Sequence, residues 1–266
     1  MRTATIRRTA LTATAVSFAL LATACGGAEK TGEDGETKGA GAAKPAAKAL
    51  TATELEKLVV SQGDIKGHEV TELEKKDLFD PASLTVDKAA CEPVAQALSF
   101  LPTGDPAATA QRLVVHESEA AKKGMPSVEE LGGMTPEEAE EATLDSLDLT
   151  KTWTSLWSYD AEGAEQALTA LREAGEKCAD GFTMTVDGTE QRVTQVGAEK
   201  LSVGQGAVAW TVGTKQDGTP AETKVAVFRQ GTTLAGFSSF NIAAVTRGEA
   251  FDQPAAVIEA QAAKLG

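Results

Sequence analysis

The chain has 266 residues, of which 42% are hydrophobic, 24% charged and only 5% aromatic. This composition provides enough apolar surface for a folded core and excludes collagen-like, disulfide-dense and wholly disordered proteins. Acidic residues outnumber basic ones by 39 to 25, which gives a net charge of −14. Because so acidic a surface repels phosphate backbones, we expect no nucleic acid among its partners.

The N-terminus has the pattern of a secretory signal peptide. Arg2, Arg7 and Arg8 precede an uncharged stretch of apolar or small residues at 9–24. This stretch is too short to cross a bilayer as a helix, which needs about 20 residues. We therefore predict a cleaved signal peptide over residues 1–24.

The sequence LATACGG at 21–27 resembles the lipobox of bacterial lipoproteins. It departs from the family pattern at Ala22, where Leu or a β-branched residue is usual. The resemblance implies that a peptidase cuts before Cys25 and that diacylglycerol is attached to its thiol. The chain would then sit on the outer face of the cell membrane, anchored by lipid. The alternative is ordinary secretion without a role for Cys25.

A linker follows the cysteine. Residues 26–48 contain no Val, Ile, Leu, Met or aromatic residue, so they can bury nothing that would offset the entropy of ordering. We predict a lipidated cysteine and disordered linker at 25–49, holding a folded domain at 50–266 about 25 Å from the membrane.

The first half of this domain gives mostly helical signals. Thr51 and Glu54 have capping-box spacing and predict a helix to about residue 61. A short strand at 67–73 is followed by a helix whose apolar stripe includes Cys91. Next come a strand at 111–117 and an acidic stretch at 119–148, in which Thr135 and Pro136 begin another helix.

The second half gives mostly strand signals. After an aromatic strand near 153–159, a helical stripe runs from Ala164 to Cys178. Asp187-Gly188 is a hairpin turn pair. The remaining strands are expected at 182–186, 191–196, 207–214, 223–229 and 232–242, before a closing helix at 254–265. Consecutive strands with segregated helices predict an α+β fold, in which helices pack on one face of an antiparallel meander.

Two cysteines remain in the domain if Cys25 carries lipid. Cys91 and Cys178 each lie in an apolar helical stripe, and two thiols outside the cytoplasm most simply form a disulfide. A redox role would favour a CxxC arrangement, which the sequence lacks. We predict that the bond joins the two helices.

The order of these elements resembles a group of secreted actinobacterial lipoproteins. More distantly, it resembles the extracellular sensor domain of mycobacterial membrane kinases of the PknH type. The residues that carry the likeness are the segment at 91–98, the helix at 164–178 and the strand that begins at Phe182. That kinase family has two disulfides and this chain can form one, so the resemblance implies the fold more than a ligand.

No motif in the sequence marks a catalytic or metal site. The nucleophile motifs G-x-S-x-G and S-x-x-K are absent, as are H-E-x-x-H and a phosphate-binding loop. The two histidines, His68 and His116, belong to separate elements. The acidic stretch lacks the alternating Asp and Gly of a calcium loop. We therefore predict no catalytic residue, metal or cofactor.

The aromatic strand is the best candidate for ligand binding. Trp153, Trp157 and Tyr159 alternate on one face, where they could stack on a sugar or a lipid headgroup. The alternative is that these rings fill the core beneath the helix that carries Cys178.

These observations favour a non-enzymatic lipoprotein of the cell envelope that binds or senses an unidentified ligand or protein partner. The alternative is an envelope hydrolase or lipid carrier. A hydrolase would show converging polar groups in a cleft, and a carrier would show a large apolar cavity.

Overall fold

The computed structural model describes residues 46–216 and 219–266. The predicted signal peptide, Cys25 and nearly all of the predicted linker lie outside the described residues. Within the described ranges, no helix combines the length and apolar character that crossing a bilayer requires.

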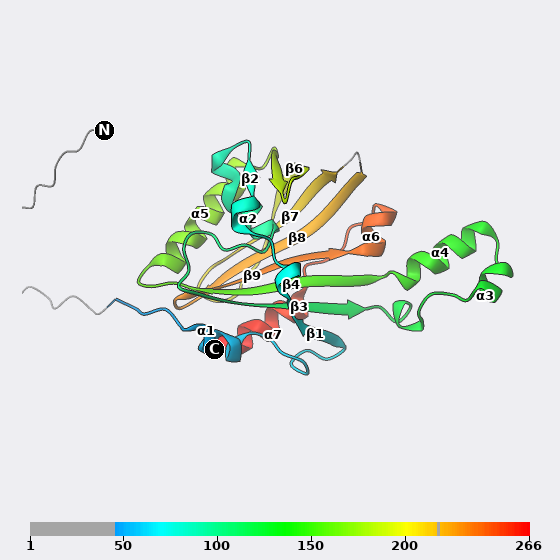
Figure 1. Ribbon diagram of the computed structural model, residues 1–266, viewed down its shortest axis with the longest axis horizontal. Helices are drawn as coiled ribbons and strands as arrows, with labels where there is room; N and C mark the ends of the chain where they lie inside the picture. Colours follow the sequence, from blue (N-terminus) through cyan, green and yellow to red (C-terminus); the bar gives the residue numbers. More distant parts are fainter. Residues whose placement is uncertain (1–45, 217–218) are drawn as a thin grey trace, which may run out of the picture. The chain divides into compact units, whose positions relative to one another are not determined.

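The strands in the described part of the chain form one antiparallel sheet (Figure 1). Their order across the sheet is β1-β3-β4-β9-β8-β7-β6-β5-β2. Strands β5 to β9 are a meander, and β9 then pairs with β4. The strands are β1 His68–Glu72, β2 Thr85–Val86, β3 Ala108–Glu117, β4 Leu149–Ser158, β5 Phe182–Val186, β6 Thr189–Glu199, β7 Ala207–Gln216, β8 Thr219–Gln230 and β9 Thr233–Asn241.

Local signals in the sequence account for several of these elements. The β5–β6 hairpin turns at Asp187 and Gly188, whose φ angles of 47° and 77° are those that the turn requires. Thr51 and Glu54 form the predicted capping box. The helices are α1 Ala52–Leu58, α2 Glu92–Leu98, α3 Val128–Gly132, α4 Pro136–Ser146, α5 Gly163–Lys177, α6 Ile242–Arg247 and α7 Ala255–Leu265.

The helices cover both faces of the sheet, and not one face as predicted. One buried cluster joins α2 and α5 to Trp157 and Val227, whereas the other joins α1 and α7 to Leu156 and Phe228. The central strands carry apolar side chains at successive positions, so both of their faces must be covered. The α+β class and the antiparallel sheet are confirmed.

The predicted disulfide is confirmed. Cys91 precedes the first residue of α2 and Cys178 caps the end of α5, with 5.7 Å between their Cα atoms. The bond therefore joins these two helices on one face of the sheet.

On the opposite face, a single glutamine connects α7 to the end of α1. Gln261 is fully buried, and its Nε2 donates to the carbonyl of Leu58 at 2.8 Å. Its Oε1 accepts from the backbone N–H of Val60 at 3.0 Å. One side chain thus satisfies the last carbonyl of α1 and the N–H of Val60 just beyond the helix.

The described part of the chain begins beside the end of β4. The carbonyl of Ala47 accepts from the N–H of Ala161, and the N–H of Ala49 donates to Asp160. The N–H of Leu50 donates to the hydroxyl of Ser158 at 2.9 Å. The first contacts with the domain are thus made just before the predicted boundary at Leu50.

At the other end of β4, residues 118–148 leave the sheet as an arm that carries α3 and α4 (Figure 1). We call these residues the acidic arm. The last β3–β4 pair is Glu117 with Leu149, and the N–H of Ser118 donates to the carbonyl of Asp148 just beyond it. Capping boxes begin both α3 and α4, at Ser127 and Thr135.

The strand predicted at 232–242 corresponds to β9, whereas the short helix α6 that follows it was not predicted. β9 ends at Asn241, whose side-chain oxygen accepts from the N–H of Ala244 and caps the new helix. The apolar residues of this short segment fit either structure, so periodicity alone does not distinguish them.

Candidate functional site

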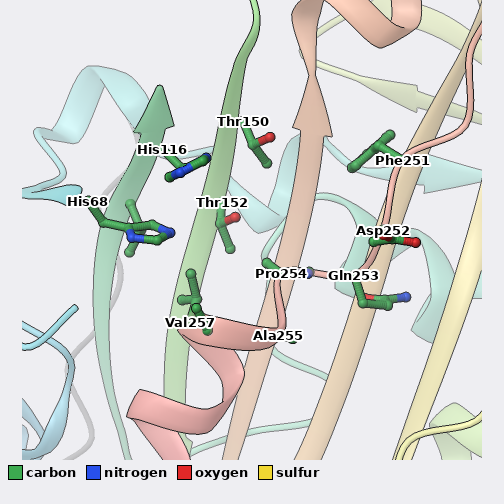
Figure 2. A pocket seen from close by; sticks show the side chains of 12 residues that line it. His68, His116, Thr150, Thr152, Phe251, Asp252, Gln253, Pro254, Ala255 and Val257 are labelled. Carbon is green, nitrogen blue, oxygen red and sulfur yellow. The ribbon is translucent and has the colours of Figure 1, made fainter. Parts of the chain in front are cut away.

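A cavity of about 440 Å³ lies between the sheet and the segment that leads into α7. Figure 2 shows His68, His116 and the threonines of β4 on one side, with Phe251, Asp252 and Gln253 across from them. Three neighbouring strands and one distant segment of the chain therefore form it. Its lining is His68, Val114, His116, Thr150, Thr152, Phe251, Asp252, Gln253, Pro254, Ala255, Ala256 and Val257.

The two histidines of the described chain face each other in this cavity. His68 on β1 pairs directly with His116 on β3, and their ring centroids are 4.7 Å apart. Nδ1 of His68 lies 3.0 Å from the carbonyl of Lys66. Because a carbonyl only accepts, this contact places a proton on Nδ1 and, in the neutral ring, leaves Nε2 as an acceptor.

His116 is held in its neutral form. Partial burial lowers the pKa of His116 below the usual 6.5, and the neighbouring His68 and Lys122 lower it further. The carboxylates of Asp148 and Glu119 oppose this effect without reversing it. At neutral pH this imidazole therefore offers one donor and one acceptor and carries no charge.

The threonine hydroxyls on β4 are already hydrogen-bonded. The hydroxyl of Thr152 shares a hydrogen bond of 2.8 Å with Ser239, and that of Thr150 accepts from Asn241 at 3.1 Å. These bonds fix the rotamers of both side chains. The sheet side of the cavity is therefore a preorganised polar surface, flanked by the apolar Val114.

An ionic cluster around the buried Lys224 supports the other wall. The ammonium of Lys224 is 2.9 Å from Glu199 and 3.1 Å from Glu222, and it lies 5.7 Å from the centroid of Phe251. Burial opposes the charge of Lys224, but its bonds to the two carboxylates outweigh burial and raise its pKa. The charged cluster therefore fixes Phe251 by a cation–π contact. Next to it, Gln253 donates to the carbonyl of Trp210 at 3.2 Å.

This arrangement suits recognition by hydrogen bonding. The cavity presents two imidazoles and the carboxylate of Asp252 beside an aromatic ring and aliphatic side chains, and a few polar groups among apolar ones are the usual composition of a small-ligand site. Within the described ranges, no three His, Cys, Asp or Glu side chains gather closely enough to hold a metal ion.

Two of the three aromatic residues proposed from the sequence lie in the core. Trp157 is 1% exposed and Tyr159 is 3% exposed, both in the cluster beneath α5. The hydroxyl of Tyr159 donates to the carbonyl of Thr103 at 2.8 Å, and burial raises its pKa well above the usual range. Trp157 and Tyr159 therefore fill the core beneath α5, which is the alternative to ligand binding that the sequence left open.

Trp153 lies apart from them, on a different surface from the histidine cavity. Its ring stacks on Phe100, with centroids 4.9 Å apart, and on Phe240 at 5.5 Å. These rings line a smaller cavity of about 250 Å³ near the end of α2. The indole therefore already has aromatic partners within the chain.

Sequence reasoning missed the histidine pair. It assigned His68 and His116 to separate elements, which is correct. However, residues 73–107 separate β1 from β3 along the chain, and the sequence of neither strand indicates that the two pair. The alternation of His68 with Val70 and of Val114 with His116 places each histidine on an apolar face, and this was the available signal.

Comparison with known proteins extends the description of the fold. No family model matches the chain, and no curated protein matches it. The crystal structure of the extracellular domain of PknH from Mycobacterium tuberculosis is similar, with a TM-score of 0.51 and 11% identity. The similarity covers 82% of this chain and 97% of that one. The expected distant resemblance is thus confirmed at the level of the fold.

Proposed function

We propose that the chain is a lipid-anchored protein of the cell envelope that binds a small, uncharged polar ligand in the cavity beside His68 and His116. Three independent features support an extracytoplasmic place: the signal-peptide pattern, the cysteine in a lipobox-like context and the disulfide. The fold, which resembles an extracellular domain, is consistent with that place.

The pairing of two imidazoles inside one cavity is the observation that carries the binding role. His116 is neutral at pH 7, and the net charge of −14 disfavours an anionic ligand approaching from solution. Hydroxyl or amide groups of a ligand could pair with Nε2 of His68 and with the ring of His116. The flanking Phe251 and Val257 could cover its apolar side. Neutral N-acetylated sugars of the cell wall, which carry hydroxyl and amide groups, have this chemistry.

The test is a titration of the isotope-labelled protein with neutral N-acetylated sugar fragments of the cell wall, followed by NMR at the histidine rings. We expect the resonances of His68 and His116 to shift, and His68→Ala or His116→Ala to weaken binding by about tenfold or more. Trp153→Phe is the matched control because Trp153 lines a different cavity. Equal loss in that control, or no shift at the histidines, would contradict the proposal.

Two further experiments separate the alternative functions. Turnover of an ester or glycoside that disappears in His116→Ala would favour the hydrolase. Native mass spectrometry that finds a co-purified lipid would favour the carrier. The described cavity does not favour a carrier, because its lining includes histidines and threonines.

The anchor needs its own test. Cys25→Ser should leave the protein uncleaved or release it from membranes into the medium. Unchanged partitioning of this variant into the detergent phase would show that Cys25 does not carry the lipid.

A further inference from the structure

The acidic arm is far longer than its connection requires. β3 and β4 are antiparallel neighbours, and a hairpin between such strands closes with two to five residues. Instead, residues 118–148 form two helices that project from the end of the sheet (Figure 1). Connections of this length in a compact domain usually have a function of their own.

The helices of the arm pack against little. Neither α3 nor α4 contains a buried residue, so their capping boxes contribute much of the local order. The base of the arm is nevertheless fixed, because Asp145 pairs with Arg247 at 2.6 Å and Asp148 accepts from Asn241 at 2.8 Å. The arm is therefore attached to α6 and β9, while its apolar side chains lack cover.

Most of the exposed large apolar side chains in the described ranges are on this arm. Val128 is 87% exposed, Met125 58% and Met134 37%, and the remaining one, Leu78, is 38% exposed on another segment. Met125 and Met134 line a groove of about 340 Å³. Methionine side chains adapt to partners of varied shape, which is why they are frequent on surfaces that bind amphipathic helices.

The acidic arm is also strongly negative. Residues 118–148 contain nine acidic and two basic residues, so the arm has a net charge of −7, half of the net −14 of the whole chain. Two carboxylates, Glu130 and Asp145, and one ammonium group, Lys123, also line the groove. The acidic residues are Glu119, Glu129, Glu130, Glu137, Glu138, Glu140, Glu141, Asp145 and Asp148.

We propose that the acidic arm is a docking surface for a basic amphipathic helix of a partner protein. The apolar face of that helix covers Met125, Val128 and Met134, and its Lys and Arg residues face the surrounding carboxylates. The lysines of this chain's own residues 26–48 are not the occupant, because that segment has no large apolar side chain to fill the groove. An anionic membrane surface would be repelled.

The experiment uses the full chain and two synthetic peptides of equal length and charge, with binding measured by fluorescence anisotropy. The first peptide combines lysines with leucines on one helical face, and the second has serine in place of every leucine. We expect the leucine peptide to bind at least about tenfold more tightly, because it buries several apolar side chains. Both affinities should fall between 50 and 200 mM salt.

Two variants locate the site. Val128→Ser combined with Met134→Ser should weaken the leucine peptide by about tenfold or more and leave the serine peptide nearly unchanged. Leu78→Ser is the control, because it removes a similarly exposed apolar side chain outside the arm. All of these positions are exposed, so circular dichroism should show unchanged folding.

Three results would overturn the proposal. The first is equal affinity of the leucine and serine peptides, which would reduce the arm to a nonspecific acidic surface. The second is an equal loss of binding in the Leu78→Ser control. The third is stronger association with vesicles of anionic lipid than with the leucine peptide, which would identify a membrane as the occupant.

Discussion

Gln261→Met tests the connection between α7 and α1. Methionine has a similar length and would fill the space, but it can neither donate to the Leu58 carbonyl nor accept well from the Val60 N–H. Gln261 is 0% exposed, so water cannot easily replace either bond. Leaving a buried polar group unsatisfied costs about 1–3 kcal/mol. Two such groups, partly offset by the added apolar surface, should lower the free energy of unfolding by about 2–4 kcal/mol.

The assay is urea denaturation followed by tryptophan fluorescence, with a thermal scan in parallel. At about 2–4 °C per kcal/mol for a domain of this size, the melting temperature should fall by roughly 4–16 °C. Gln205→Met is the matched control: Gln205 accepts from the N–H of Gly231 at 3.1 Å, but the bond is exposed. Its loss should change stability by less than about 0.5 kcal/mol.

Similar stabilities of the two variants would refute this reasoning. They would show that α1 finds other partners when Gln261 is removed, or that water reaches Leu58 and Val60. An unchanged slope of the free energy of unfolding against urea concentration would confirm that the variants and the parent expose the same amount of surface on unfolding.

Three further outcomes can be measured on the same domain. Replacing Cys91 and Cys178 by serine should lower stability by about 4–5 kcal/mol, because the bond closes a loop across a sequence separation of 87. Gly236→Ala should destabilise by about 1–3 kcal/mol in thermal melts, because its Cβ would lie 2.4 Å from the ring of Trp157. NMR titration should place the pKa of His116 below 6.5. Between that pKa and 6.5 the unfolded chain binds more protons than the folded chain, so the free energy of unfolding decreases as the pH is lowered.

Each of these has a contrary result. Two free thiols in native protein before reduction would contradict the disulfide. A Gly236→Ala variant as stable as the parent would mean that Trp157 moves without cost. If His116→Gln loses as much stability as the parent between pH 7 and 5, the titration of His116 does not contribute to that loss.

Short-range signals in the sequence account for much of the fold. The capping boxes at Thr51 and Thr135, the turn at Asp187-Gly188 and the apolar stripe that contains Cys178 all depend on neighbours within a few residues. The disulfide followed from the number of cysteines and the expected compartment, with no need for geometry. Such features can be derived because their physical causes are local.

The site could not be predicted in the same way. The pairing of His68 with His116 requires the order and register of strands that the chain connects through α2 and other elements. Nor does the alternation, which places Trp153 and Trp157 on the same face, show how deeply each position is covered, so the same pattern includes a half-buried ring and one that is 1% exposed. The depth depends on helices from elsewhere in the chain, which the strand's own sequence does not specify.

The direction of β4 determines how the domain is presented. At about 3.3 Å per residue, its ten residues span roughly 33 Å. One end, Ser158, holds the incoming chain at Leu50, whereas the other end, Leu149, receives the acidic arm. His116 pairs with Thr150, near the Leu149 end, so the histidine cavity lies toward the arm and away from the point where the chain enters. With the proposed lipid at Cys25, the tether would reach the domain at the end of β4 opposite both surfaces, so a partner could bind either one without contacting the attachment at Leu50.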